Sequence, residues 1–375
     1  MKKRFFLIVF LGILGTMMMN AQPLKIEFEE YDLDNGLHVI LHEDHSTPIV
    51  AVTVMYHVGS KNEQEDKKGF AHFFEHLMFE GSKYIDRHEY SEYVEKAGGT
   101  LNASTSSDRT YYYEVLPSNQ LELGLWLESE RMLHAKVDSV GIATQKKVVI
   151  EEKKQRYDNQ PYGSWMIEIS KRAFKKHPYR WTTIGSEEDI RNATYEDVKE
   201  FYETFYVPNN AVITIAGDIN KEETKKLVEK YFAGIPKGKY DIPRPEVVEP
   251  VKNKEIRDTV YDNIRLPAIF MAYHTPAMGT DDFYAVEMLS SLLSEGESSR
   301  LYKKLVDEKE LAMNVMSFPF PYEHPGLNYV FALPNVGKDP LELEKALNAE
   351  IKKIQENLIT DKELEKLKNQ YKSSL

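Results

Sequence analysis

Apolar and polar positions alternate in several short segments of the chain, a pattern with the period of two that predicts β-strands. Segments 25–31 and 37–41 flank Asn35-Gly36, a pair typical of a tight hairpin turn because both residues tolerate positive φ values. Further strands, rich in β-branched residues and tyrosine, are predicted over 49–58, 100–107, 110–116 and 209–215.

Segments with helical spacing of apolar residues lie between these strands. Helix is predicted over 69–81, 87–97, most of 119–157, and 195–205. The run 69–81, GFAHFFEHLMFEG, has no proline and no interior glycine, so it has room for about three helical turns. Because strands and helices mix without strict alternation, the predicted fold class is α+β, with mostly antiparallel sheets packed with helices.

The second half of the chain repeats landmarks of the first, on either side of a proline-rich stretch, 236–250, that predicts an interdomain linker. Landmarks recur 215 to 217 residues later: Tyr56-His57 as Tyr273-His274, Glu80-Gly81 as Glu295-Gly296, Leu116-Pro117 as Leu333-Pro334, and TQKKVVIEEKKQRY from Thr144 as TDKELEKLKNQY from Thr360. This spacing indicates an internal duplication.

The duplication predicts two homologous domains, 23–235 and 251–375. A complete second copy would run to about residue 450, so we expect the second domain to be incomplete at its C-terminus and the sequence to be truncated. The histidines and glutamate of the run 69–81 do not recur in the second copy. Only the first domain therefore carries a candidate catalytic site.

Residues 1–22 begin with Lys2, Lys3 and Arg4, followed by an apolar run from Phe5 to Met19. This run is short for a membrane span, which needs about 20 residues, and a basic start before it is typical of a secretory signal peptide. We therefore expect an exported protein, periplasmic or secreted. The alternative is a retained membrane anchor.

Composition is that of a soluble globular protein, with 42% hydrophobic and 29% charged residues. The formal net charge is −12, and about −15 without residues 1–22, which argues against nucleic acid or an anionic membrane surface as partner. Cysteine is absent, so an exported chain has no disulfides. Any metal site must use His, Asp or Glu.

His72 and His76 lie four residues apart in the predicted helix 69–81, so both rings project from one face, with Glu75 beside them. The other positions are apolar nearly all round and predict a buried helix: Phe73, Phe74, Leu77, Met78 and Phe79. Ionisable groups on a buried helix need a partner or a metal ion. The alternative is two core histidines that share the carboxylate by hydrogen bonds.

A catalytic zinc ion takes three protein ligands and leaves a fourth position for water. His72 and His76 supply two ligands from one rigid helix, and the third must come from elsewhere. Glu75 is not needed as a ligand. It is therefore free to take a proton from water as general base and to pass it to the leaving nitrogen.

The adjacent acidic candidates for the third ligand, Glu151 and Glu152, lie on the next long helix. Helical phase places Glu152 on one face with Gln145, Val148 and Val149, and Glu151 on a face with lysines. We therefore expect Glu152 to point to the metal and Glu151 to be solvated.

The motif H-x-x-E-H is the inverse of the common zinc motif H-E-x-x-H. Over nearly the whole mature chain the sequence resembles the pitrilysin, insulinase and mitochondrial processing peptidase family. Glu152 follows His76 by 76 residues, as in that family. Further similar segments are GTLNA at 99–103, HPYRWTTIGSEEDI from His177, YVPNNAVITIAGD from Tyr206 and SSRLYKKLVDEKELA from Ser298.

The resemblance implies two homologous α+β domains that help to enclose a chamber. It implies that zinc, one per chain, is held by His72, His76 and Glu152, with Glu75 as base. It also implies that Asn102 and Ala103 bind an extended peptide by strand addition, in which main-chain hydrogen bonds hold the substrate. The alternative interpretation, which the residues alone would favour, is that segment 100–107 is an ordinary edge strand without a role in binding.

Two departures from the family pattern affect the expected site and partners. Gln145 stands where the family commonly has a second glutamate, which weakens the negative charge behind the ligands. Val306 and Met313 stand where active single chains have an arginine and a tyrosine that contact substrate, and neither side chain has that polar chemistry. Some bacterial relatives divide these parts between two chains. We therefore expect a homologous partner chain that supplies the Arg/Tyr pair, with a homodimer as the alternative.

The favoured function is a zinc-dependent endopeptidase that hydrolyses peptide bonds in peptides or unfolded protein segments. One alternative is a non-catalytic structural or binding subunit of a peptidase-like assembly. The complete set of His72, Glu75, His76 and Glu152 argues against this alternative, since a structural role does not need them. Another is a zinc-binding or storage protein without turnover.

Overall fold

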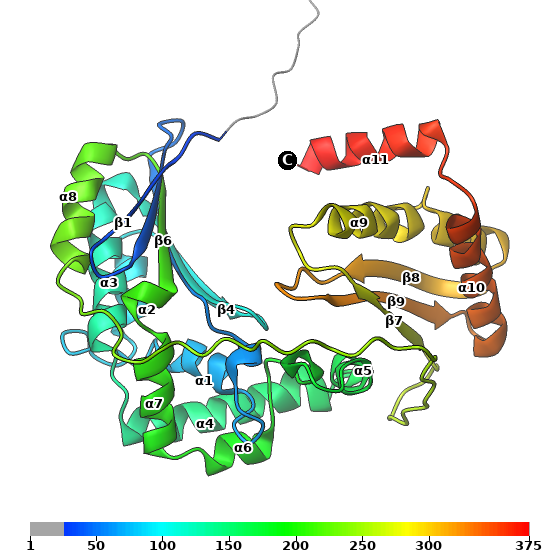
Figure 1. Ribbon diagram of the computed structural model, residues 1–375, viewed down its shortest axis with the longest axis horizontal. Helices are drawn as coiled ribbons and strands as arrows, with labels where there is room; N and C mark the ends of the chain where they lie inside the picture. Colours follow the sequence, from blue (N-terminus) through cyan, green and yellow to red (C-terminus); the bar gives the residue numbers. More distant parts are fainter. Residues whose placement is uncertain (1–25, 375) are drawn as a thin grey trace, which may run out of the picture.

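The computed structural model describes residues 26–374 (Figure 1). The predicted signal peptide, residues 1–22, lies outside this range. Among the described residues, no helix has both the length and the apolar character that crossing a membrane requires.

The first half of the chain builds a six-stranded sheet with the strand order β1-β2-β6-β3-β5-β4. All neighbouring strands are antiparallel except β2 and β6. The strands are β1 (Glu29–Asp32), β2 (His38–Glu43), β3 (Ile49–Tyr56), β4 (Thr100–Thr105), β5 (Thr110–Pro117) and β6 (Ala211–Gly217). The α+β prediction is confirmed, and β4 lies at the sheet edge.

The turn between β1 and β2 differs in detail from the prediction. Gly36 has a φ of +86°, but Asn35 does not adopt a positive φ. Asn35 is instead buried, and its side-chain amide donates to the carbonyls of Phe232 and Ile235 at 2.8 and 2.9 Å. These tertiary hydrogen bonds hold the β1–β2 hairpin against the end of helix α8 (Lys221–Phe232).

Helices cover one face of this sheet, where alternate strand residues are buried. Figure 1 shows α3 and α8 on that face, with the opposite face turned toward the second half. The helices of this half are α1 (Phe70–Leu77), α2 (Glu89–Lys96), α3 (Leu121–His134), α4 (Ser139–Lys153), α5 (Trp165–Ala173), α6 (Glu187–Asn192), α7 (Tyr195–Phe205) and α8 (Lys221–Phe232).

Helix α1 is shorter than the three turns predicted over 69–81. It ends at Leu77, and the chain continues in tighter turns, with the N–H of Phe79 bonded to His76 O and that of Glu80 to Leu77 O. Gly81, at a φ of +100°, then redirects the chain. Both histidines remain inside the regular helix.

The second half forms a three-stranded antiparallel sheet in the order β7-β9-β8. Its elements are β7 (Ile269–Thr275), α9 (Asp281–Ser294), β8 (Ala312–Pro319), β9 (Gly326–Pro334), α10 (Pro340–Glu356) and α11 (Asp361–Ser374). This order matches β3-β5-β4 of the first sheet. Leu116-Pro117 and Leu333-Pro334 end the corresponding strands β5 and β9, as the spacing of the repeat predicts.

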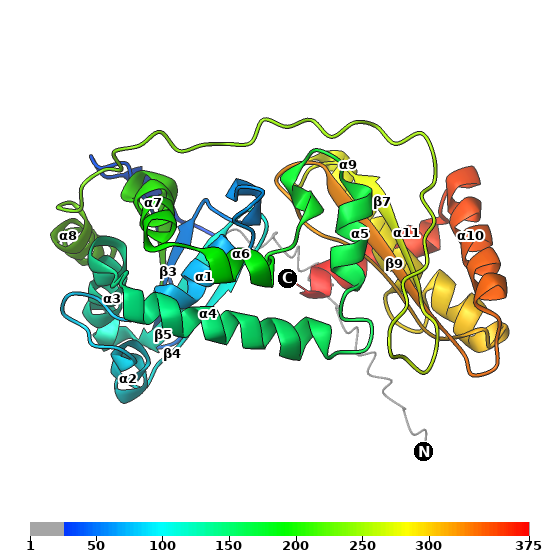
Figure 2. The same cartoon turned by 90° about the horizontal axis from the view of Figure 1, so that it is seen from below.

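Two connections join the halves, a helical one and an irregular one. After α4, the chain reaches α5, which packs on the second sheet although it precedes the predicted linker; the Trp165 ring stacks on Phe270 and meets Tyr329 edge-on. Residues 236–250 form neither helix nor strand, and the irregular chain continues to β7. Figure 2 shows this segment running along one side of the molecule from α8 to β7.

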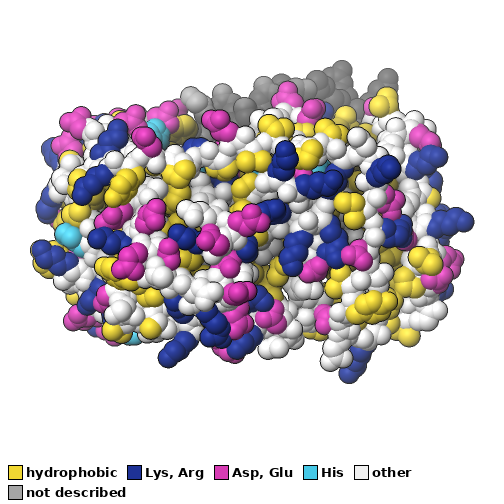
Figure 3. Space-filling view, turned by 60° about the horizontal axis from the view of Figure 1, so that its bottom comes forward, with side chains coloured by type: hydrophobic (Ala, Val, Ile, Leu, Met, Phe, Trp, Pro, Cys, Tyr) yellow, Lys and Arg dark blue, Asp and Glu magenta, His cyan; other side chains and the backbone are white. Residues whose placement is uncertain are grey.

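Charged side chains of both signs are interspersed on the face shown in Figure 3, between scattered apolar ones. The excess of acidic residues is therefore not gathered into one patch on that face. This mixed surface is typical of a soluble domain.

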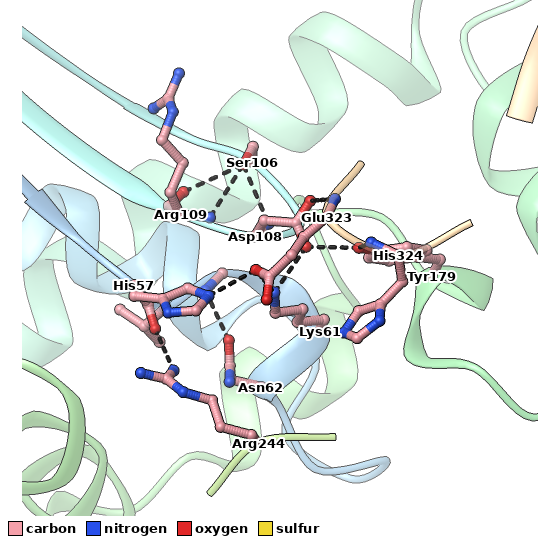
Figure 4. Close-up of polar contacts among 12 residues, drawn as sticks. His57, Lys61, Asn62, Ser106, Asp108, Arg109, Tyr179, Arg244, Glu323 and His324 are labelled. Carbon is pink, nitrogen blue, oxygen red and sulfur yellow. Dashed lines mark hydrogen bonds and ion pairs between the residues drawn. The ribbon is translucent and has the colours of Figure 1, made fainter. Parts of the chain in front are cut away.

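A buried lysine joins the two halves directly (Figure 4). The Lys61 side chain is 1% exposed; its ammonium lies 2.9 Å from Asp108 Oδ1 and also donates to Glu323 Oε2. The same oxygen of Glu323 lies 2.6 Å from His57 Nε2. Glu323 belongs to the β8–β9 loop of the second half, whereas His57, Lys61 and Asp108 belong to the first. We call these four residues the junction.

Burial works against ionisation of Glu323, but the hydrogen bonds from Lys61 and His57 outweigh it and lower the pKa of Glu323 to about 2. A lowered carboxyl pKa stabilises the folded state above the unfolded pKa of about 4.3, and this contribution disappears as the pH falls toward the folded value.

We therefore expect Glu323→Gln to lower the free energy of unfolding near pH 7 by about 1 kcal/mol, because Glu323 is partly exposed and Lys61 keeps Asp108. The difference from the unsubstituted protein should shrink as the pH falls below about 5. Urea unfolding followed by circular dichroism between pH 7 and 3 measures it. Glu203→Gln, at a similarly exposed position, serves as control. A difference that grows toward acid pH would contradict this account.

Candidate active site

The start of helix α1 is held by a glycine and a buried carboxylate. Gly69 has a φ of +95°, and a Cβ there would lie 3.1 Å from the carbonyl oxygen of Ile184. The carboxylate of Glu63 accepts the backbone N–H groups of Gly69 and Ala71, both at 2.9 Å, and so caps the first turn. Burial raises the pKa of Glu63, and these two bonds oppose the rise.

The apolar residues of α1 fix its rotation about its own axis. The hydrophobic core between the first sheet and its helices, which we call the first core, buries Phe70, Phe73, Phe74 and Leu77. The Phe74 ring stacks on that of Tyr206, with centroids 5.2 Å apart. The prediction of a buried helix is confirmed. The polar residues of the helix share the remaining face.

Two histidines and a glutamate meet on that face. His72 and His76 approach with their Nε2 atoms 3.3 Å apart. Glu152 Oε2, on α4, lies 3.6 Å from His72 Nε2 and 3.1 Å from His76 Nε2. No other group of three or more His, Asp or Glu side chains in residues 26–374 brings its ligand atoms together in this way.

These distances fit a zinc ion. With zinc–nitrogen and zinc–oxygen bonds of about 2.0–2.1 Å, two ligands of a tetrahedral site lie roughly 3.3 Å apart. The three donor atoms of His72, His76 and Glu152 match this separation. The Nε2 atoms of both histidines and Oε2 of Glu152 therefore lie close enough together for all three to bind one ion. The donor set therefore fits the metal, and two imidazoles with one carboxylate leave the fourth position of a catalytic zinc site for water.

Helix α4 supplies the third donor as helical phase predicts, with one correction. The Glu152 side chain is 15% exposed and faces α1, whereas that of Glu151 is 57% exposed. Val149 is buried, but Val148 is exposed, so its predicted place on the inward face is wrong. The inward face runs through Gln145, Val149 and Glu152 at spacings of four and three residues.

The protonation states of these groups favour metal binding. Burial, and then repulsion from His76, lower the pKa of His72 to about 4, so its ring is neutral at pH 7, the form that binds a metal. The hydrogen bond with His76 lowers the pKa of Glu152, against burial. The other oxygen of Glu152, Oε1, lies 3.0 Å from the guanidinium of Arg156 in the π-helical turn Lys154–Asp158.

Glu75 lies on α1 between the histidines and edge strand β4. Thr105, the last residue of β4, donates its hydroxyl to Glu75 Oε2 at 2.5 Å. Burial raises the pKa of Glu75, and the bond from Thr105 opposes the rise. A raised carboxyl pKa brings a group closer to the range in which a general base works.

The predicted substrate-binding residues, Asn102 and Ala103, lie in β4, which has one free edge. The backbone N–H of Ala103 donates to the side-chain oxygen of its neighbour Asn102 at 2.8 Å. An added peptide strand that used this N–H would have to displace that side chain.

The positions that depart from the family pattern lie outside the donor set. Gln145 donates to Glu80 Oε1 at 2.6 Å, and Glu80 pairs with Arg87. In the second half, Val306 packs against the core, and Met313 on β8 is 50% exposed. Neither offers a polar group to a substrate.

Three supporting residues were missed in the sequence. Glu63 precedes α1 by seven residues and could have been sought as an acidic cap. Arg156 follows Glu152 by four residues, the spacing of a helical ion pair, and so had a local signal. Thr105 had no such signal, because its contact with Glu75 spans 30 residues and depends on how β4 packs against α1.

A rigid helix with two histidines, a third acidic donor and a separate carboxylate define the site of a zinc metallopeptidase. Comparisons with known proteins agree. Residues 38–187 match the family described as insulinase (peptidase family M16), and residues 192–371 match the peptidase M16 inactive domain.

Individual relatives support this assignment. The chain is 34% identical over 363 residues to the zinc protease PqqE of Helicobacter pylori, covering 96% of this chain and 82% of that protein. It is 26% identical over 354 residues to a probable mitochondrial-processing peptidase subunit beta of Arabidopsis thaliana, covering 92% and 66%. The crystal structure of a Helicobacter pylori protease superposes with a TM-score of 0.90 at 33% identity, covering 93% and 85%. The chain belongs to peptidase family M16 and is a zinc protease of that family.

We expect zinc to stabilise the protein through the three donors. At 100 times its Kd, zinc should raise the free energy of unfolding by about 2.7 kcal/mol. His76→Ala should abolish the rise, whereas His38→Ala, on β2, should keep it. Thermal unfolding of metal-free protein with and without zinc measures the effect. An equal rise for His76→Ala would place zinc elsewhere.

Arg156 should tune metal affinity, because it fixes the second oxygen of Glu152. Loss of such outer contacts typically costs 10- to 100-fold in affinity, and the exposure of Arg156 points to the lower figure. We expect Arg156→Gln to weaken zinc binding about tenfold in competition titrations with a chelator. The conservative Arg156→Lys should recover part of the loss; unchanged affinity in Arg156→Gln would refute this role.

Proposed function

We propose that this chain is an endopeptidase that hydrolyses peptide bonds in peptides or unfolded protein segments, with Glu75 as general base. The observation that carries the proposal is the placement of Glu75. Glu75 is close enough to interact electrostatically with His76 and Glu152 without belonging to the donor group, and one of its oxygens is held by Thr105.

The residues divide the chemistry between them. His72, His76 and Glu152 would hold zinc, which supplies a Lewis acid that lowers the pKa of a water molecule. Glu75 accepts the proton of the attacking water and delivers it to the nitrogen of the scissile bond, so that the C–N bond breaks and a carboxylic acid and an amine are released. The raised pKa of Glu75 suits both steps.

Substrate would bind as an added strand on β4. Its free edge offers main-chain groups at Asn102 and Ala103, next to Thr105 and Glu75. Strand addition recognises the extended backbone and not a particular sequence. Most main-chain groups of a folded domain are already hydrogen-bonded within it, which is why peptides and unfolded segments are the proposed substrates.

The alternative of a non-catalytic subunit leaves Glu75 unexplained. A structural metal site is closed by four ligands, whereas this site offers three donors and a separate carboxylate. A zinc-storage role leaves Glu75 and the free edge of β4 without a purpose.

We further propose an exported protein that works with a homologous partner chain. Residues 1–22 have the pattern of a secretory signal, which supports export.

The partner chain is proposed because Val306 and Met313 lack the polar chemistry to hold a substrate. The name of the plant relative makes that protein one subunit of an assembly. Light scattering and mass spectrometry of protein purified from its source would separate a heterodimer from a homodimer, and a monomer would contradict the partner.

Glu75→Gln tests the central role. We expect the variant to retain one zinc per chain, since the donors are intact, but to lose 10²- to 10⁴-fold in kcat on an unfolded protein or a quenched fluorescent peptide. Glu151→Gln, exposed on α4, should leave both properties unchanged. Retained cleavage by Glu75→Gln would exclude Glu75 as base. If the unsubstituted protein binds zinc but cleaves no substrate, either alone or together with its partner chain, the protein would instead store zinc.

A further inference from the structure

The contact between Thr105 and Glu75 joins two parts of the site that are far apart in the sequence. Leu101 and Ala103 on β4 pack against the first core, and Thr105, two residues further, faces the same side of the strand. Its hydroxyl therefore reaches Glu75 on α1 at 2.5 Å. The strand that would hold the substrate thus ends in a side chain that holds the base.

The turn after Thr105 is anchored by its own hydrogen bonds and by a neighbouring loop. Ser106 N–H donates to Arg109 O at 2.8 Å, and the Ser106 hydroxyl accepts the N–H groups of Asp108 and Arg109. The backbone N–H groups of Ser60 and Lys61 donate to Ser106 O and Ser107 O at 3.3 and 2.9 Å. Thr105 is therefore followed by a closed turn with fixed backbone geometry.

The second half holds this turn through the junction. Asp108, in the turn, accepts from buried Lys61, from the Tyr179 hydroxyl at 2.6 Å, and from the backbone N–H of Glu323 at 3.1 Å. The carboxylate of Glu323 also pairs with Lys61. Figure 4 shows the side chains of Lys61, Asp108 and Glu323 converging where the two halves meet.

We propose that Thr105 is a positioning residue for the general base, and that the junction with Glu323 keeps the turn carrying it in place. The Thr105 hydroxyl holds Glu75 Oε2, which leaves Oε1 to exchange the proton. In this way the second half, which supplies none of the three zinc donors, contributes to the geometry of the reaction. The inference rests on the proposed role of Glu75.

Small displacements of a base have large effects, since a misplacement of about 1 Å can cost 10²-fold in rate. Without the hydroxyl, the Glu75 carboxylate is free to rotate about its terminal torsion, which has a broad energy minimum. The loss should appear in kcat and not in KM, because Thr105 contacts the base and the edge main chain of β4 is kept.

Paired substitutions of Thr105 test the proposal. Thr105→Val removes the hydroxyl at nearly constant shape and should lower kcat 10- to 100-fold, with KM within twofold, one zinc per chain, and an unchanged melting temperature. Thr105→Ser keeps the hydroxyl and should retain most of kcat. Thr53→Val, which removes another hydroxyl from the same sheet, is the matched control. Equal losses in the Val and Ser variants, or an unchanged kcat in Thr105→Val, would overturn the role of the hydroxyl.

A double-mutant cycle tests the junction. Glu323→Gln, assayed well below its melting temperature, should lower kcat severalfold in the unsubstituted protein but have little further effect in Thr105→Val, because both act on the same carboxylate. Losses that multiply would show that Glu323 does not act through Thr105.

A crystal structure supplies a readout that does not depend on activity. In zinc-loaded Thr105→Val the Glu75 carboxylate should be rotated or disordered, whereas in Thr105→Ser it should keep its position. An unchanged carboxylate in Thr105→Val would refute the inference even if Glu75 is the base. Loss of cleavage by Glu75→Gln is a separate result, so failure of the proposed function can be told from failure of this one.

Discussion

Three electron-pair donors from two helices point at one position, and the rest of the first half serves to keep them there. The donor atoms of His72, His76 and Glu152 lie 3.1–3.6 Å apart because α1 packs against α4. That packing comes from the aromatic face of α1 in the first core and from the cap that Glu63 forms at its start. Zinc that binds these donors in the folded protein would stabilise the folded state.

The two halves have related strand orders and different tasks. The first half carries the donors, the base and the free edge of β4. The second half lacks these groups, yet it is tied to the first by α5, which packs on its sheet, and by the buried Lys61 with Asp108 and Glu323. The β4–β5 turn lies at the contact between the halves, and this turn follows directly on the residue that holds Glu75. This placement is the basis of our proposal that the second half contributes to catalysis.

Local periodicity was enough to predict most of the elements of the first half and the residues at the centre of the site, but not α5, α6 or α8. The spacing of His72 and His76 depends only on helical geometry, and the phase of α4 distinguished Glu152 from Glu151. Phase alone misplaced Val148, because it fixes relative directions within a helix but not which neighbours cover its margins. Periodicity also did not show that the chain passes into tighter turns after Leu77, or that tertiary hydrogen bonds hold the side chain of Asn35. The packing of α5 and the contact of Thr105 with Glu75 involve residues distant in sequence, which periodicity cannot relate.

Anomalous X-ray diffraction at the zinc absorption edge, from crystals of the purified protein, tests the central claim most directly. The account predicts one strong peak per chain, about 2.0–2.2 Å from His72 Nε2, His76 Nε2 and Glu152 Oε2, with Glu75 outside the ligand set. A peak at another position, Glu75 among the ligands, or no peak in zinc-loaded crystals would contradict it.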